Sequence, residues 1–172
     1  MTSVASNPQV VCTPEEVTVP WLSQALGPEV RSVRTELVGT GQIGCCLLAH
    51  VDGDGLPPTL FVKLPNPDEG MRPLLHGVYR TEVLFYGDLA PTVAVRVPRV
   101  RFAALGEREG EFTLILDDVT PLVQGDQLAG LTIDQARDCA VNLAGLHGPR
   151  WCDPTLRSIE GLAAPTVEDN IT

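Results

Sequence analysis

The turn sequence Asp52-Gly53-Asp54-Gly55 constrains the fold of this chain more than any other feature. It separates two apolar runs, CCLLAHV at 45–51 and TLFVKL at 59–64. Asp-Gly pairs between such runs are typical of a β-hairpin, because the turn needs positive φ angles that glycine adopts without strain. The two runs are therefore predicted to be neighbouring antiparallel strands. A third strand is expected over 30–38, where the residues alternate in polarity.

A glycine-rich segment, GTGQIG at 39–44, joins the strands predicted at 30–38 and 45–51. Its G-x-G-x-x-G spacing occurs in two different kinds of nucleotide-binding fold. In a dinucleotide-binding fold the motif opens a helix, which holds the pyrophosphate at its N-terminus. Here a strand follows, which favours a loop that covers phosphate groups at the tip of a hairpin. A plain glycine-rich turn is the alternative.

Apolar residues at spacings of three and four predict an amphipathic helix over 73–90, which Pro91 ends. The residues that carry this pattern are Met71, Leu74, Leu75, Val78, Phe85, Tyr86 and Leu89. Two further strands are expected, over 97–105 and 111–117.

Two further helices have sequence signals at their starts. Thr13-Pro14-Glu15-Glu16 predicts a short helix that Gly27 ends, with a break near Pro20 as the alternative. Thr132-Ile133-Asp134-Gln135 is a capping box for a helix over 132–147. No element is expected after 148. The predicted class is α+β: a five-stranded antiparallel sheet with a packed helix, followed by the first helix of an incomplete helical region.

Lys63 is the single lysine among the 12 basic residues of the chain. It lies within an apolar strand pattern, where an ammonium group is costly unless it is paired. Glu82 lies on the otherwise apolar stripe of the helix predicted at 73–90, and a carboxylate there needs a cation. We therefore predict that the two side chains pair. A lysine that reaches solvent from a strand edge is the alternative.

The composition excludes some classes of partner. The net charge of −10 argues against nucleic acid and anionic membranes as main partners, because phosphate-rich surfaces require a basic face. No apolar run is long enough to span a membrane, and no signal peptide is expected. Five cysteines without a C-x-x-C pair favour reduced thiols in a cytoplasmic protein over a disulfide framework or a zinc site. The three histidines are expected to be structural.

The order of these motifs resembles the N-terminal lobe of the protein-kinase-like fold. The segments GTGQIG, YRTEVLFYGDLA and LILDDV, with a later helix that ends LAGLHGPRW, are similar to the aminoglycoside phosphotransferase, choline kinase and ecdysteroid-kinase-like group. The resemblance spans roughly 30–152. It implies an N-terminal tail and short helix over 1–29, a kinase-like lobe over 30–118, and a connector with the start of a C-terminal lobe over 119–172.

The resemblance also implies roles for individual residues. Lys63 is expected to contact the α- and β-phosphates of ATP, and Glu82 to hold Lys63 in place. The residues expected at the loop over the phosphates are Gly39, Thr40, Gly41, Gln42 and Gly44. The residues expected at the hinge, where the backbone binds adenine, are Asp117, Asp118 and Val119.

The catalytic loop of this family is missing from the sequence. His147-Gly148 is followed by Pro149 rather than by the catalytic Asp, so no catalytic residue and no metal ligand is assigned, and magnesium is expected only with a C-terminal lobe. The expected function is the ATP-binding lobe of a small-molecule kinase for an unidentified hydroxyl acceptor, truncated and inactive alone. The alternative is a non-catalytic nucleotide-binding or protein-interaction module that a partner chain completes. Self-association through the helix at 132–147 is also expected.

Overall fold

The computed structural model describes residues 8–39, 43–122, 125–126 and 128–162. The chain forms two compact units. One unit runs through Val83 and resumes over Pro98–Pro121, and the other comprises Leu84–Val97 and the chain from Leu122 onward. No helix among the described residues is long and apolar enough to cross a membrane.

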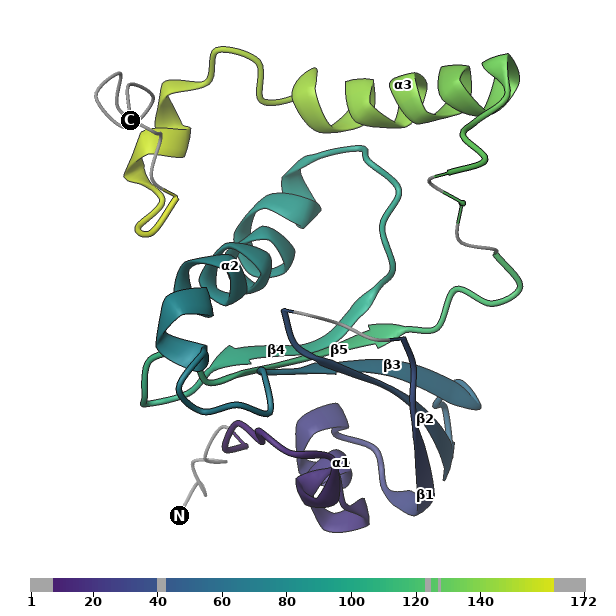
Figure 1. Ribbon diagram of the computed structural model, residues 1–172, viewed down its shortest axis with the longest axis vertical. Coiled ribbons are helices and arrows are strands. Elements are labelled where there is room, and N and C mark those ends of the chain that lie inside the picture. The colour runs from purple at the N-terminus through teal and green to yellow at the C-terminus, as the bar shows by residue number, and fades with distance from the viewer. Residues whose placement is uncertain (1–7, 40–42, 123–124, 127, 163–172) are drawn as a thin grey trace. The chain divides into compact units, whose positions relative to one another are not determined.

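The first unit is built on a five-stranded antiparallel sheet, as predicted, with the strand order β1-β2-β3-β5-β4 (Figure 1). The strands are β1 (Val30–Leu37), β2 (Cys45–Gly53), β3 (Thr59–Leu64), β4 (Val100–Leu105) and β5 (Phe112–Asp117). The predicted hairpin joins β2 to β3, and Gly55 in its turn has φ +76°. β3 therefore lies at the centre of the sheet, between β2 and β5.

Helix α1 (Val19–Leu26) and the preceding segment cover one face of the sheet. Trp21 and Leu22 pack with Leu60, Val62 and Leu64 in the main hydrophobic core. These three β3 residues are fully buried, and they alternate with partly exposed neighbours. This alternation is the period of two that a strand with one face on the core requires.

The predicted helix after Thr13 is two elements rather than one. Pro14–Glu16 form a 3₁₀ turn, and α1 begins only at Val19. The Glu16 carboxylate accepts the Thr13 amide at 2.9 Å and the Cys12 amide at 2.7 Å. α1 ends at Gly27, as predicted, where φ is +91°.

Helix α2 (Arg72–Leu84) lies on the opposite face of the sheet from α1 (Figure 1). The helix predicted over 73–90 is therefore confirmed for most of its length. It changes after Leu84 into a π-helical turn, Phe85–Leu89, and then a 3₁₀ turn, Ala90–Thr92. Tyr79 anchors α2 to the sheet, because its ring stacks on Phe112 with the ring centroids 4.2 Å apart.

The second unit contains α3 (Ile133–His147), which begins at the predicted capping box. The Gln135 amide donates to the Thr132 hydroxyl at 3.2 Å, and the Thr132 amide donates to the Gln135 side chain at 2.9 Å. A short 3₁₀ turn, Pro154–Ser158, follows after 148, where no element was expected. The Asp153 carboxylate caps this turn by accepting the Thr155 amide at 2.8 Å.

α3 contacts the 94–96 segment through Asn142 and Gly145, while its apolar residues Ile133 and Leu143 are exposed. Asn142 accepts the Arg96 amide at 2.8 Å, and the Gly145 carbonyl accepts the Ala94 amide at 2.9 Å. A Cβ at Gly145 would lie 2.9 Å from the Ala94 backbone, so this close approach requires glycine. Polar backbone contacts at the end of the helix therefore decide its orientation against the 94–96 segment.

Candidate functional site

Lys63 lies on the α2 face of the central strand β3. Its apolar neighbours Val62 and Leu64 point to the other face, into the core beneath α1. Lys63 therefore does not share a face with Val62 and Leu64, because adjacent residues of a strand point to opposite faces. The cross-strand partners of Lys63 are Cys46 on β2 and Leu114 on β5. The Lys63 side chain is 28% exposed, so its ammonium is reachable from solvent.

Glu82 on α2 pairs with Lys63, as the sequence predicted. The Lys63 Nζ donates to the Glu82 Oε1 at 2.5 Å, and the Glu82 side chain is 26% exposed. A partly buried ion pair of this kind holds both side chains in one geometry more firmly than a fully exposed pair does. The pair therefore presents a positioned ammonium on the α2 face of the sheet.

The stripe of α2 that carries Glu82 is not the predicted one. Leu74 is 76% exposed and Val78 is 47% exposed. The buried residues of the helix are Arg72 and Tyr79, which lie seven residues apart, and Glu82 follows Tyr79 after three residues, near the same face. Glu82 is therefore the carboxylate that pairs with Lys63, but the residues buried beside it are Arg72 and Tyr79 rather than Leu74 and Val78.

The sequence predicts that one of Cys45 and Cys46 points into the core and the other toward the nucleotide or solvent, without deciding which, and Cys46 lies beside the ion pair. Burial raises the pKa of the Cys46 thiol; the positive charge of Lys63 acts against this rise and the negative charge of Glu82 adds to it. The thiol is therefore protonated at neutral pH. The predicted β2–β3 hairpin could have pointed to this thiol, because Cys46 pairs directly with Lys63 across the two strands.

Two of the predicted loop glycines have a structural requirement for glycine. Gly39 has φ +76°, which other residues adopt only with strain. A Cβ at Gly44 would lie 2.5 Å from the Leu64 carbonyl oxygen, so the chain can approach β3 here only without a side chain. Thr40, Gly41 and Gln42 lie outside the described residues. Close packing explains Gly44 whether or not a ligand binds, so a plain turn and a phosphate loop both accommodate it.

Tyr79 connects the end of the glycine-rich segment to α2 and is a residue that sequence reasoning missed. Its hydroxyl donates to the Ile43 carbonyl at 2.5 Å and accepts the Asn66 amide at 3.1 Å. The Arg72 Nε donates to the Asn66 carbonyl at 2.8 Å. The two buried residues of α2 therefore hold both the glycine-rich segment and the connection between β3 and α2.

The acidic residues predicted at the hinge are engaged by other side chains. Asp117 accepts the Arg101 Nε at 2.6 Å and pairs in register with Leu60, which lies on the α1 face of the sheet. Asp118 accepts the Thr59 hydroxyl at 2.8 Å and the Thr120 amide at 3.0 Å. Burial alone would raise the pKa of Asp118, but these hydrogen bonds outweigh it and lower the pKa. The predicted adenine contact thus depends on the backbone of 117–119 and stays a prediction.

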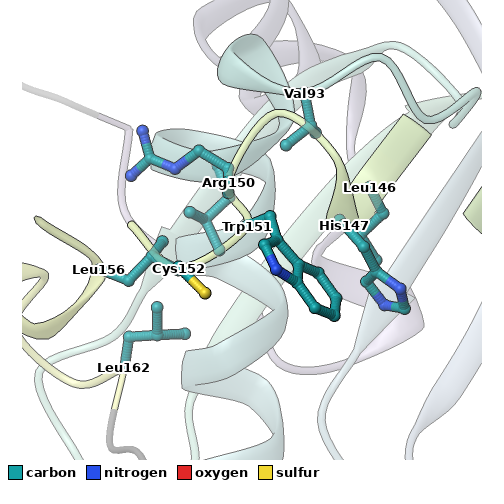
Figure 2. A pocket seen from close by; sticks show the side chains of 9 residues that line it. Val93, Leu146, His147, Arg150, Trp151, Cys152, Leu156 and Leu162 are labelled. Atoms are coloured by element: carbon teal, nitrogen blue, oxygen red, sulfur yellow. The ribbon is translucent and has the colours of Figure 1, made fainter. Parts of the chain in front are cut away.

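A separate apolar cavity of about 340 Å³ lies in the second unit (Figure 2). Its lining residues are Leu89, Val93, Leu146, His147, Arg150, Trp151, Cys152, Leu156 and Leu162. Trp151 lines this cavity and is 74% exposed. The Arg150 Nε lies 3.2 Å from the Asp153 carboxylate, so the cation at this cavity already has an anionic partner.

The described part of the chain contains no group of three or more His, Cys, Asp or Glu side chains arranged to hold a metal ion. His50 lies 3.2 Å from Glu36, and the His76 Nδ1 accepts the Gly110 amide at 3.1 Å. These two histidines therefore have structural partners.

Comparisons with known proteins give three similar solved structures. The GDP and kanamycin complex of the phosphotransferase APH(2″)-IIIa is 18% identical with a TM-score of 0.48, and the match covers 87% of this chain and 46% of that one. The GDP complex of wild-type aminoglycoside 2′-phosphotransferase IIIa is 18% identical with a TM-score of 0.47, and the match covers 81% of this chain and 43% of that one.

This chain therefore spans less than half the length of these structures. No protein-family model matches the sequence. No curated protein matches it either.

Proposed function

We propose that this chain forms the nucleotide-binding lobe of a small-molecule kinase, which transfers the γ-phosphoryl group of ATP to a hydroxyl acceptor. One observation carries the proposal: Lys63 on the central strand is held by Glu82 from α2, on the face of the sheet away from the main core. Lysine suits this position because its compact ammonium has three N–H donors, of which Glu82 uses one. The others are available to phosphate oxygens.

The glycine-rich segment supports the same proposal. Gly44 packs directly against the Leu64 backbone, next to Lys63 in β3, so the end of the segment lies beside the strand that carries the ammonium. Backbone amides in such a segment are able to approach phosphate oxygens closely, because glycine leaves no side chain in the way. The residues proposed to bind the phosphates thus come from β3, α2 and the connection between β1 and β2.

In this proposal, the chain binds the nucleotide and orients its phosphate groups. Lys63 binds the phosphates and offsets their charge, Glu82 orients Lys63, and the backbone of 117–119 contacts adenine. The sequence contains no H-G-D catalytic loop, so the acceptor, the catalytic base and the magnesium ligands are not assigned to it. We expect weak ATP binding, with a dissociation constant between high micromolar and millimolar, or about 4–5 kcal/mol.

Titration calorimetry of the 172-residue chain with ATP, and separately with GTP, tests this proposal. Lys63→Met should abolish binding while circular dichroism shows a folded chain. Arg137→Met is the control, because it removes an exposed cation from α3, whose carboxylate partner is Asp134. The proposal is wrong if neither nucleotide binds, or if Lys63→Met binds as well as the wild type.

A non-catalytic module completed by a partner chain is the second candidate. The exposure of α3 favours it, since Ile133 is 80% exposed and Leu143 is 50% exposed on a helix without buried residues. Apolar side chains left in water on one helix are typical of a surface that another segment covers. The same titration separates the candidates, because a pure interaction module does not require ATP binding that depends on Lys63.

A further inference from the structure

The side chain of Tyr79 reaches from α2 to the end of the glycine-rich segment. Its hydroxyl donates to the Ile43 carbonyl at 2.5 Å, although the two residues lie 36 positions apart in the sequence. The same oxygen accepts the Asn66 amide at 3.1 Å, just beyond the end of β3. One phenol therefore joins three parts of the chain: the entry to β2, the exit from β3, and α2.

Packing of the Tyr79 ring holds its hydroxyl in one position. The Tyr79 ring is 1% exposed and stacks on Phe112 of β5 at an interplanar angle of 15°. Burial raises the pKa of Tyr79, although the Asn66 hydrogen bond and the Arg72 charge act against this rise, so the phenol keeps its proton at neutral pH. It therefore serves as a donor to Ile43 over the whole physiological range.

Tyr79 and Glu82 lie three residues apart on α2 and so share one face of the helix. Glu82 holds Lys63, and Tyr79 holds Ile43. A helix of 13 residues moves as one body over such a short distance. A shift of α2 that separates Glu82 from Lys63 would therefore also displace the end of the glycine-rich segment.

We propose that the Tyr79 hydroxyl is a positioning group that couples Ile43 and Gly44, at the end of the glycine-rich segment, to the Lys63–Glu82 pair, so that both adopt their nucleotide-binding positions together. The inference rests on the proposed function, since it concerns the same site. Gly44 strengthens the coupling, because its contact with the Leu64 carbonyl leaves the segment little room to move toward β3. Tyr79 contacts backbone groups of the chain and acts through Lys63 and the glycine-rich segment.

Tyr79→Phe tests the coupling, because it keeps the ring that stacks on Phe112 and removes only the hydroxyl. We expect ATP binding to weaken about tenfold, since the Ile43 carbonyl loses its donor and the end of the segment loses its anchor. Amide hydrogen exchange of Asn66 should become faster, as its acceptor is gone. Thr81→Val is the matched control: it removes an exposed hydroxyl of the same helix that donates only to the Gly77 carbonyl, so it should change neither measurement.

The outcomes separate this inference from the proposed function. If the wild type binds ATP and Tyr79→Phe binds it equally well, the coupling is wrong and the proposed function stands. If the wild type binds no nucleotide, the proposed function is wrong. Exchange then decides the coupling alone: faster exchange of Asn66 and of Cys45 together in Tyr79→Phe supports it, and a change confined to Asn66 contradicts it.

If Tyr79→Phe does not fold, hydrogen exchange of the wild-type chain tests the coupling instead. In rising urea, the amides of Cys45, Asn66 and α2 should lose protection at the same concentration. Earlier exposure of Cys45 while α2 stays protected would overturn the inference.

Discussion

Lys63 on β3 and Glu82 on α2 form an ion pair across 19 residues of sequence, with 2.5 Å between the Nζ and Oε1 atoms. Each side chain is about a quarter exposed, so the pair is accessible to a ligand and still ordered by its surroundings. The pair lies on the face of the sheet that α2 covers, and the main hydrophobic core lies on the other.

Glu82→Gln should weaken ATP binding about tenfold, because the neutral amide no longer holds the Lys63 ammonium by charge. The free energy of unfolding should fall by less than about 1 kcal/mol, as is usual for partly exposed pairs. Calorimetry and urea unfolding measure the two effects. Asp134→Asn is the control, because it breaks an exposed pair with Arg137 of the same 2.5 Å length. Equal ATP affinities in Glu82→Gln and wild type would contradict the role of Glu82.

Two glycine substitutions should have opposite effects on stability. Gly44→Ala places a Cβ 2.5 Å from the Leu64 carbonyl oxygen and should lower the free energy of unfolding by about 1–3 kcal/mol. Gly77→Ala should raise it by about 0.5–1 kcal/mol, because Gly77 lies inside α2 with open space around it. Urea unfolding of both variants provides the measurement. A stabilised Gly44→Ala would show that the segment does not approach β3 as closely as described.

The Cys46 thiol should react slowly with iodoacetamide at neutral pH. Burial raises its pKa above the ordinary value of 9.0, so the reactive thiolate forms only in more alkaline solution. Its labelling rate, followed by peptide mass spectrometry, should still increase above pH 9. Cys139 is exposed on α3 and provides the comparison within the same chain. A Cys46 rate that levels off below pH 9 would contradict the described environment.

The exposed side of α3 should mediate self-association of the isolated chain. Ile133 and Leu143 lie ten residues apart, near one face of the helix, and each large apolar side chain left in water forgoes about 1.5–3 kcal/mol. The double substitution Ile133→Gln and Leu143→Gln should therefore increase the monomer fraction in sedimentation equilibrium. Gln is chosen because it keeps helix propensity. A wild-type chain that stays monomeric at high concentration would disprove this prediction.

Local patterns were enough to predict the strands and their order along the chain. The turn at 52–55 and the alternation on either side specify the β2–β3 hairpin, because turn chemistry and side-chain period act over only a few residues. The Lys63–Glu82 pair was also predictable. Each is a single charge in an apolar pattern, and buried charges require partners.

Only the tertiary structure decided which face of α2 is buried. The periodicity of Met71, Leu74 and Val78 favoured an apolar stripe, yet the helix buries Arg72 and Tyr79. The choice depends on partners distant in sequence that no local pattern encodes. Phe112 offers a ring for stacking, and the backbone at Ile43 and Asn66 needs polar partners that leucine or methionine cannot supply.

The partners of the predicted hinge residues were likewise decided by the tertiary structure. The sequence determined that β5 ends in two adjacent carboxylates, Asp117 and Asp118. Their partners, Arg101 and Thr59, lie on β4 and β3, and the strand order brings them together. Strand order and register are properties of the assembled sheet, because backbone pairing between distant segments sets them. The sequence by itself therefore determined which residues carry charge, and the folded sheet decided which of those charges are already paired.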